Sequence, residues 1–132
     1  MPAFQHICIN SNNYEEAIHF YCDLIGLKIH AESFSKNKNA TKVELYDESG
    51  YAIELFVNTG WPVADEIAVR RGGALITGFD HLSFYEDDPD AKLAFLKENG
   101  VEIIETQVDP GTGKKYGFCF SPEGLKIEFY EK

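Results

Sequence analysis

The sequence has few cysteines, and they do not have the spacing of a metal or disulfide motif. The number of cysteines is odd, and no Cys-x-x-Cys pair occurs. The three are Cys8, Cys22 and Cys119. The pattern argues against a disulfide framework and against a cysteine-rich zinc site. We interpret the three thiols as small apolar residues of a protein from a reducing compartment.

The chain also lacks an apolar run near the roughly 20 residues that a membrane-spanning helix needs. Its first residues show no basic stretch followed by an apolar one, so we predict no secretory signal and a cytoplasmic location. Positive charge is scarce, because 12 Lys and Arg stand against 22 Asp and Glu, for a net charge of −10. That balance repels nucleic acids and anionic membranes, and the expected partner is a small molecule.

The composition is that of a folded protein. The chain has 132 residues, of which 44% are hydrophobic and 14% aromatic. This length and composition predict one globular domain over 1–132. Helical spacing of apolar residues predicts helices over 14–25 and 89–99. Alternating runs predict strands over 4–10, 41–46, 51–57, 79–85, 116–120 and 125–130, with weaker ones near 28–34 and 102–108.

An internal repeat is the most informative feature of the sequence. FQHI resembles FDHL 75 residues later, and GYAIELF resembles GLKIEFY 74 residues later. Each half is therefore expected to run strand, helix, strand, strand, strand. The predicted fold class is α+β, with two βαβββ modules in tandem (1–58 and 79–132) forming curved mixed sheets around a metal-containing cavity. The connection 59–78 is either a plain linker or a lid over the site.

The repeat places one His and one Glu at matching positions of each half. These residues are His6, Glu54, His81 and Glu128. A lone His or Glu in a strand is usually an outward-facing polar residue, but duplication favours a shared cavity. Four ionisable groups in a cavity need a counter-charge, which a divalent cation supplies. Their nitrogen and oxygen donors suit Ni, Co, Zn, Mn or Fe and leave two octahedral positions open for water or substrate. His19 and His30 have no counterpart in the other half, and we interpret them as structural or surface residues.

These motifs resemble the vicinal-oxygen-chelate superfamily, which includes glyoxalase I, extradiol dioxygenases and bleomycin-resistance proteins. The matching pieces cover essentially the whole chain: FQHICI, FYCDLIGLKI, AIELF, GFDHLSF and SPEGLKIEFYE. The order His, Glu, His, Glu looks like that of glyoxalase I, and the nearest resemblance is to small bacterial glyoxalase-like proteins. The resemblance implies a lactoylglutathione lyase-like metalloenzyme. It would transfer a proton through a metal-stabilised enediolate, on a hemithioacetal of a 2-oxoaldehyde with glutathione or another thiol.

The resemblance also implies roles for individual residues. Glu128 would remove the proton, and Glu54 would return it or remain a ligand. Asn58 matches a glutathione-contacting Asn, whereas Asn10 stands where glyoxalase I usually has an Arg, which weakens the case for glutathione itself. Cys8 faces the same side as His6 and is expected to line the cavity. The cations that would serve an anionic substrate are Arg70, Arg71, Lys114 and Lys115.

Other functions on the same scaffold stay open from the sequence. One is a metalloenzyme of a different reaction type, such as an epimerase, isomerase or dioxygenase. Another is a non-enzymatic protein that binds a small ligand. Members of the superfamily often pair, so a homodimer is also expected.

Overall fold

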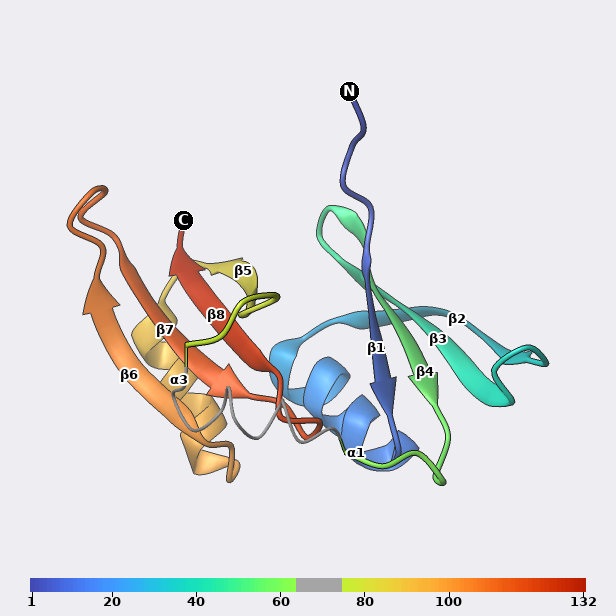
Figure 1. Ribbon diagram of the computed structural model, residues 1–132. Helices are drawn as coiled ribbons and strands as arrows, with labels where there is room; N and C mark the ends of the chain where they lie inside the picture. The colour runs from blue at the N-terminus through green and yellow to red at the C-terminus, as the bar shows by residue number, and fades with distance from the viewer. Residues whose placement is uncertain (64–74) are drawn as a thin grey trace. The chain divides into compact units, whose positions relative to one another are not determined.

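The computed structural model describes residues 1–63 and 75–132 (Figure 1). The chain divides into two compact units, Met1–Pro62 and Val63–Lys132, each of which is described by itself. Most of the predicted linker or lid, including Arg70 and Arg71, lies outside the described residues. Within them, no helix has the length and apolar character needed to cross a membrane.

Each unit contains one four-stranded mixed sheet, and the two sheets have the same topology. The strand orders are β1-β4-β3-β2 and β5-β8-β7-β6. In each sheet the first and last strands of the unit pair in parallel, and the other neighbours are antiparallel. The predicted α+β class and the duplicated order of elements are confirmed. The strands are β1 (Ile7–Ser11), β2 (Lys28–Ser35), β3 (Ala40–Asp47), β4 (Gly50–Val57), β5 (Leu82–Glu86), β6 (Ile103–Val108), β7 (Lys115–Phe120) and β8 (Lys126–Glu131).

Both predicted helices are present, and local signals define their ends. In the first unit, α1 (Tyr14–Ile18) continues into the π-helical segment η1 (His19–Ile25), so the predicted helix changes its winding half-way. The Asn13 side chain caps its start by accepting a hydrogen bond from the Glu16 amide at 3.0 Å. Gly26 ends it in the left-handed region at φ 102°, where a side chain would be strained. In the second unit, α3 (Pro89–Glu98) has Pro in its first turn and Asp88 as its cap.

Strand alternation separates an apolar face from a polar face in each sheet. In the first sheet, Val43 and Leu55 are fully buried, while Cys8 and Glu54 lie opposite each other on the other face. Glu54 also lies directly opposite Glu44 of β3, on that same polar face. In the second sheet, Ile127 and Phe129 are buried and Glu128 between them points the other way. The pattern that forms the core therefore also assigns the ionisable side chains to a single face.

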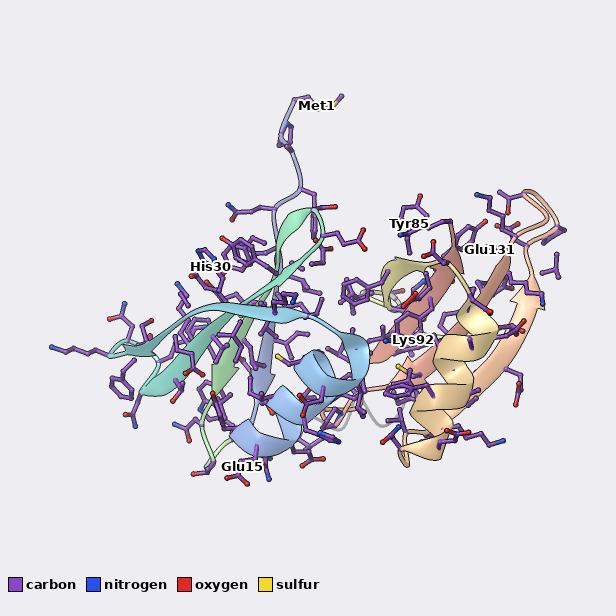
Figure 2. The ribbon with its side chains drawn as sticks, turned by 180° about the vertical axis from the view of Figure 1, so that it is seen from behind. Met1, Glu15, His30, Tyr85, Lys92 and Glu131 are labelled. Carbon is purple, nitrogen blue, oxygen red and sulfur yellow. The ribbon has the colours of Figure 1, made fainter. Side chains whose placement is uncertain are left out.

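In the second unit, α3 lies along the sheet formed by β6, β7 and β8 (Figure 1). Figure 2 shows Lys92 on this helix, and its ammonium lies 3.9 Å from the Glu86 carboxylate. Burial lowers the pKa of Lys92, and the nearby Glu86 partly opposes that effect. The helix thus covers the face opposite Glu128 and leaves the polar face of the sheet uncovered by it.

Gly117 is where α3 and β7 come closest. A Cβ added there would lie 2.4 Å from Leu93 Cδ1 and 3.1 Å from the Ile104 carbonyl oxygen. Leu93 is itself buried, so it has little room to move. Gly117→Ala is expected to lower the free energy of unfolding by about 1–3 kcal/mol, as overpacked cores do. Urea denaturation measures this, and Gly60→Ala, whose added Cβ meets only the half-buried Asn58 side-chain oxygen at 3.2 Å, is the control. Equal stability of the two variants would contradict the close packing.

Candidate functional site

The first half brings His6 and Glu54 together. Glu54 lies in β4 opposite Cys8, and His6 immediately precedes β1. The imidazole Nε2 lies 4.0 Å from Glu54 Oε1, and the two side chains are 28% and 22% exposed. Both groups are therefore accessible from solvent while fixed on the polar face of the sheet.

Two neighbours hold the His6 ring. Gln5 Oε1 lies 2.8 Å from its Nδ1, an arrangement in which the amide oxygen accepts a hydrogen bond from Nδ1–H, and the other ring nitrogen, Nε2, faces Glu54. The Tyr51 ring stacks on the imidazole with centroids 4.5 Å apart and an interplanar angle of 15°. The Tyr51 hydroxyl also donates to Glu54 Oε2 at 3.4 Å. Burial, reinforced by Glu54 and Glu44, raises the pKa of Tyr51, so this hydroxyl remains a donor across the physiological range.

The second half repeats the arrangement with His81 and Glu128. His81 Nε2 lies 3.7 Å from Glu128 Oε1, and its Nδ1 lies 2.7 Å from Asp80 Oδ2. Ser83 occupies the position equivalent to Cys8 and donates its hydroxyl to Glu128 Oε1 at 2.8 Å. Phe118 packs edge-on against the imidazole, with centroids 5.3 Å apart. Each unit thus presents one oriented imidazole nitrogen beside one carboxylate.

Lysines accompany the first pair. Lys42 Nζ lies 3.7 Å from Glu54 Oε2 and 3.9 Å from Glu44 Oε1. Lys38, from the β2–β3 turn, reaches back over the Phe56 ring at 3.9 Å from its centroid and lies 3.9 Å from Cys8 Sγ. Burial raises the pKa of the Cys8 thiol, and Lys38 opposes that effect. Cys8 is therefore mainly a neutral thiol on the same face as Glu54.

The predicted substrate-binding residues fall into different places. Asn10 is exposed and pairs in register with Phe56, the residue whose ring lies under the Lys38 ammonium. The Asn58 side chain is engaged, since it donates to the Asn39 carbonyl at 2.7 Å and accepts from the Gly60 amide at 2.8 Å. It holds the end of β4 to the turn that carries Lys38.

Lys115 is separated from the Glu128 face. It is an odd number of residues from Phe118, which lies opposite Glu128, so its side chain leaves the other face of β7. There its ammonium binds Asp90 of α3 at 2.6 Å, and Asp90 also accepts from Thr106 at 2.5 Å. This cation therefore pairs with α3 on the face of the sheet opposite Glu128.

The structure corrects the expected starts of two strands and adds residues that the sequence pattern did not reveal. His6 and His81 were expected inside strands, but β1 and β5 begin one residue later, at Ile7 and Leu82. The parallel ladders start there, opposite Ile53 and Ile127, and leave the imidazoles at the strand entrances. The missed residues are those that orient the rings and carboxylates: Gln5, Tyr51, Asp80 and Ser83. The repeat does point to Gln5 and Asp80, because they occupy the same position in its two copies, directly before the histidine.

The donors fit half of a metal site in each unit. A metal-binding imidazole needs one nitrogen held by an acceptor and the other free, and both histidines have that form. Nitrogen and carboxylate donors suit the borderline divalent metals. Among residues 1–63 and 75–132, no group of three or more His, Cys, Asp or Glu side chains gathers as a complete metal site. The described geometry therefore consists of two matching pairs of donors.

Comparison with known proteins places the chain in a family. The sequence model of the Glyoxalase/Bleomycin resistance protein/Dioxygenase superfamily matches residues 3–129. The chain belongs to this superfamily. It is 34% identical over 132 residues to the uncharacterized protein YaeR of Escherichia coli strain K12, covering 100% of this chain and 98% of YaeR.

Solved structures of the superfamily share the fold. A glyoxalase family protein from Enterococcus faecalis is 32% identical, with a TM-score of 0.78 over 98% of this chain and 97% of that one. Glyoxalase I from Zea mays is 20% identical, with a TM-score of 0.76 over 96% of this chain and 43% of that one. At that identity the maize enzyme shows a common fold and leaves the reaction to be argued from the residues of this chain.

Tyr51 offers a direct test of how the first pair is held. Tyr51→Leu removes the ring that stacks on His6 and the hydroxyl that reaches Glu54, and we expect divalent-metal affinity to fall about 10-fold, as for other outer-shell partners. Tyr51→Phe keeps the stacked ring and loses only a hydrogen bond of 3.4 Å, so the expected fall is less than about threefold. Competition titration against a chromophoric chelator measures both. A loss of affinity in Tyr51→Phe as large as that in Tyr51→Leu would show that the hydroxyl, not the ring, supports the site.

Proposed function

We propose that this protein is a metal-dependent lyase of the glyoxalase I type, which isomerises the hemithioacetal of a 2-oxoaldehyde and a thiol. The observation that carries the proposal is the duplicated pair of an oriented imidazole Nε2 and a carboxylate, at 4.0 Å in one half and 3.7 Å in the other. Superfamily membership over residues 3–129 supports it.

The proposed ligands of one divalent ion are His6, Glu54, His81 and Glu128. Ni, Co, Zn, Mn and Fe are the candidates for this donor set. When bound, such an ion would supply Lewis acidity toward two adjacent oxygens of the substrate. Whether one chain or two copies of a homodimer provide the four side chains can be tested by measuring the mass of the metal-bound protein in solution, because a monomer must provide all four from one chain.

The two carboxylates have different surroundings, and we assign them different tasks. Glu54 pairs with the Lys42 ammonium, whose Nζ lies 3.7 Å from its Oε2. Among the described residues Glu128 forms no ion pair with Lys or Arg, and the Ser83 hydroxyl orients its Oε1. Glu128 is therefore better suited to take the proton from carbon, and Glu54 to remain a ligand or to return a proton.

Fewer residues of the chain indicate which thiol the substrate contains than indicate how the metal is bound. Asn10 and Cys8 lie on the same face as Glu54, and the Lys38 ammonium lies 3.9 Å from Cys8 Sγ. An amide at position 10 offers hydrogen bonds but no charge, so Lys38 is the nearby cation for a carboxylate of glutathione or of another thiol. We propose Asn10, Cys8 and Lys38 as substrate contacts in the first half, with Asn58 as the residue that holds their turn in place. Arg71 stays a proposed contact that lies outside the described residues.

A turnover assay tests the proposal. Purified protein, freed of metal and reloaded with each candidate ion, is mixed with methylglyoxal and a panel of thiols that includes glutathione. Thioester formation in at least one combination, lost with a chelator and restored by the ion, is the expected result. No turnover with any ion or thiol would reject the lyase assignment.

The same assay separates the other reaction types of the scaffold. Two carboxylates flanking one substrate also suit an epimerase or isomerase, which would incorporate solvent deuterium without consuming oxygen. A dioxygenase would lose activity under anaerobic conditions. A non-enzymatic binding protein would retain its ligand in the presence of a chelator.

A further inference from the structure

Both proposed metal-binding histidines are held by the residue directly before them. Gln5 Oε1 accepts from His6 Nδ1 at 2.8 Å, and Asp80 Oδ2 accepts from His81 Nδ1 at 2.7 Å. The two contacts have the same geometry, and the residues that make them stand 75 positions apart in the repeat. The duplication therefore includes the group that fixes each ring, as well as the ring itself.

The two holding groups differ in charge. A carboxylate accepts a stronger hydrogen bond than an amide oxygen, and it raises the electron-donating capacity of the other ring nitrogen. His81 has such a partner, whereas His6 has a neutral one. The imidazole of the second half is therefore the better donor toward a cation.

The surroundings also hold the Asp80 carboxylate in place. Lys126 Nζ lies 3.9 Å from the same Asp80 oxygen and 4.2 Å from the centroid of Phe118, which packs edge-on against His81. The carboxylate is thus held on one side by an ammonium and on the other by the imidazole it orients. Gln5 has no comparable ion pair among the described residues, and His6 depends on the flat face of Tyr51.

We propose that Asp80 makes the second half the stronger of the two metal-binding halves, as a positioning residue for His81, with Gln5 as its weaker neutral counterpart. The inference rests on the proposed function, because it assumes that both histidines bind the ion. It adds that the two halves contribute unequally and that one exchangeable residue before each histidine sets the difference.

Reciprocal substitutions test this with Co²⁺ alone. Asp80→Asn keeps a side chain that can accept from Nδ1 and removes the charge, and we expect Co²⁺ affinity to fall about 10–100-fold. Gln5→Glu adds the charge to the first half and is expected to strengthen binding several-fold. Gln5→Asn, the matched control that changes no charge, is expected to alter affinity by less than about threefold. Asp80→Glu, which retains the carboxylate, is expected to lose less affinity than Asp80→Asn.

The readouts are competition titration and the visible absorption of bound Co²⁺, with thermal unfolding of the metal-free variants as a check on folding. The Asp80 side chain is 53% exposed, so its replacement should leave the metal-free fold intact. If Asp80→Asn does not fold, the Co²⁺ affinity of Gln5→Glu still tests the effect of a charge before the histidine. Wild-type affinity in Asp80→Asn, or equal losses in Asp80→Asn and Gln5→Asn, would overturn the inference while the proposed function stands. Absence of Co²⁺ binding by the wild-type protein would overturn both.

Discussion

His81→Ala is expected to lower the affinity for divalent metal by at least about 100-fold. The substitution removes a nitrogen donor outright, so its effect should exceed the 10–100-fold loss typical of outer-shell partners. It also leaves Glu128 without the imidazole that faces it at 3.7 Å. Competition titration with Zn²⁺ or Co²⁺ measures the loss, and turnover at a fixed metal concentration should fall in parallel.

The matched control is His19→Ala. His19 pairs with Asp23 on the surface at 2.9 Å, and its side chain is 58% exposed. It has no counterpart in the second half of the repeat, so its loss should leave metal affinity unchanged. Equal losses in the two variants would mean that binding is non-specific, and no loss in His81→Ala would remove His81 from the set of ligands.

Much of the fold follows from period-two alternation and from the repeat. Each expected strand has its counterpart in the structure, because alternation buries one face of each sheet and exposes the other. Glu54 and Glu128 lie beside His6 and His81 because the first and last strands of each half pair in parallel. The repeat predicted that first and last strands come together, and the structure adds that they pair in parallel within each half.

Other features depend on choices among hydrogen-bond partners, which no sequence pattern reveals. From the sequence, Lys115 was expected to serve an anionic substrate. In the structure its ammonium binds Asp90 of α3 at 2.6 Å. Asn58 matched a ligand-contacting position, yet both of its polar groups bind backbone of the chain itself. The π-helical winding of η1 is likewise not apparent from the apolar spacing, which predicted one regular helix over 14–25.

The arrangement of Glu128 also bears on the direction of the proposed chemistry. Its Oε1 faces both His81 Nε2 and the Ser83 hydroxyl, whereas the equivalent oxygen of Glu54 lies beside a thiol that burial keeps neutral. A hydroxyl at 2.8 Å fixes the carboxylate more firmly than a thiol can, because sulfur is a weak donor. The two halves are thus related by duplication but differ in the group that orients each carboxylate.

Glu128→Gln is therefore expected to lower kcat by about 10²–10⁴-fold, the range supplied by a positioned general base. Gln has almost the same shape and can still accept from Ser83, so the change removes the proton acceptor without creating a cavity. The measurement is kcat at saturating metal, together with exchange of the substrate carbon proton into deuterated solvent, which should fall by the same factor. Ser83→Ala, which leaves the carboxylate but not its hydrogen bond, should cost only about 10-fold. Glu54→Gln is the matched variant in the other half: if it abolishes exchange while Glu128→Gln retains it, the roles of the two carboxylates are the reverse of those assigned.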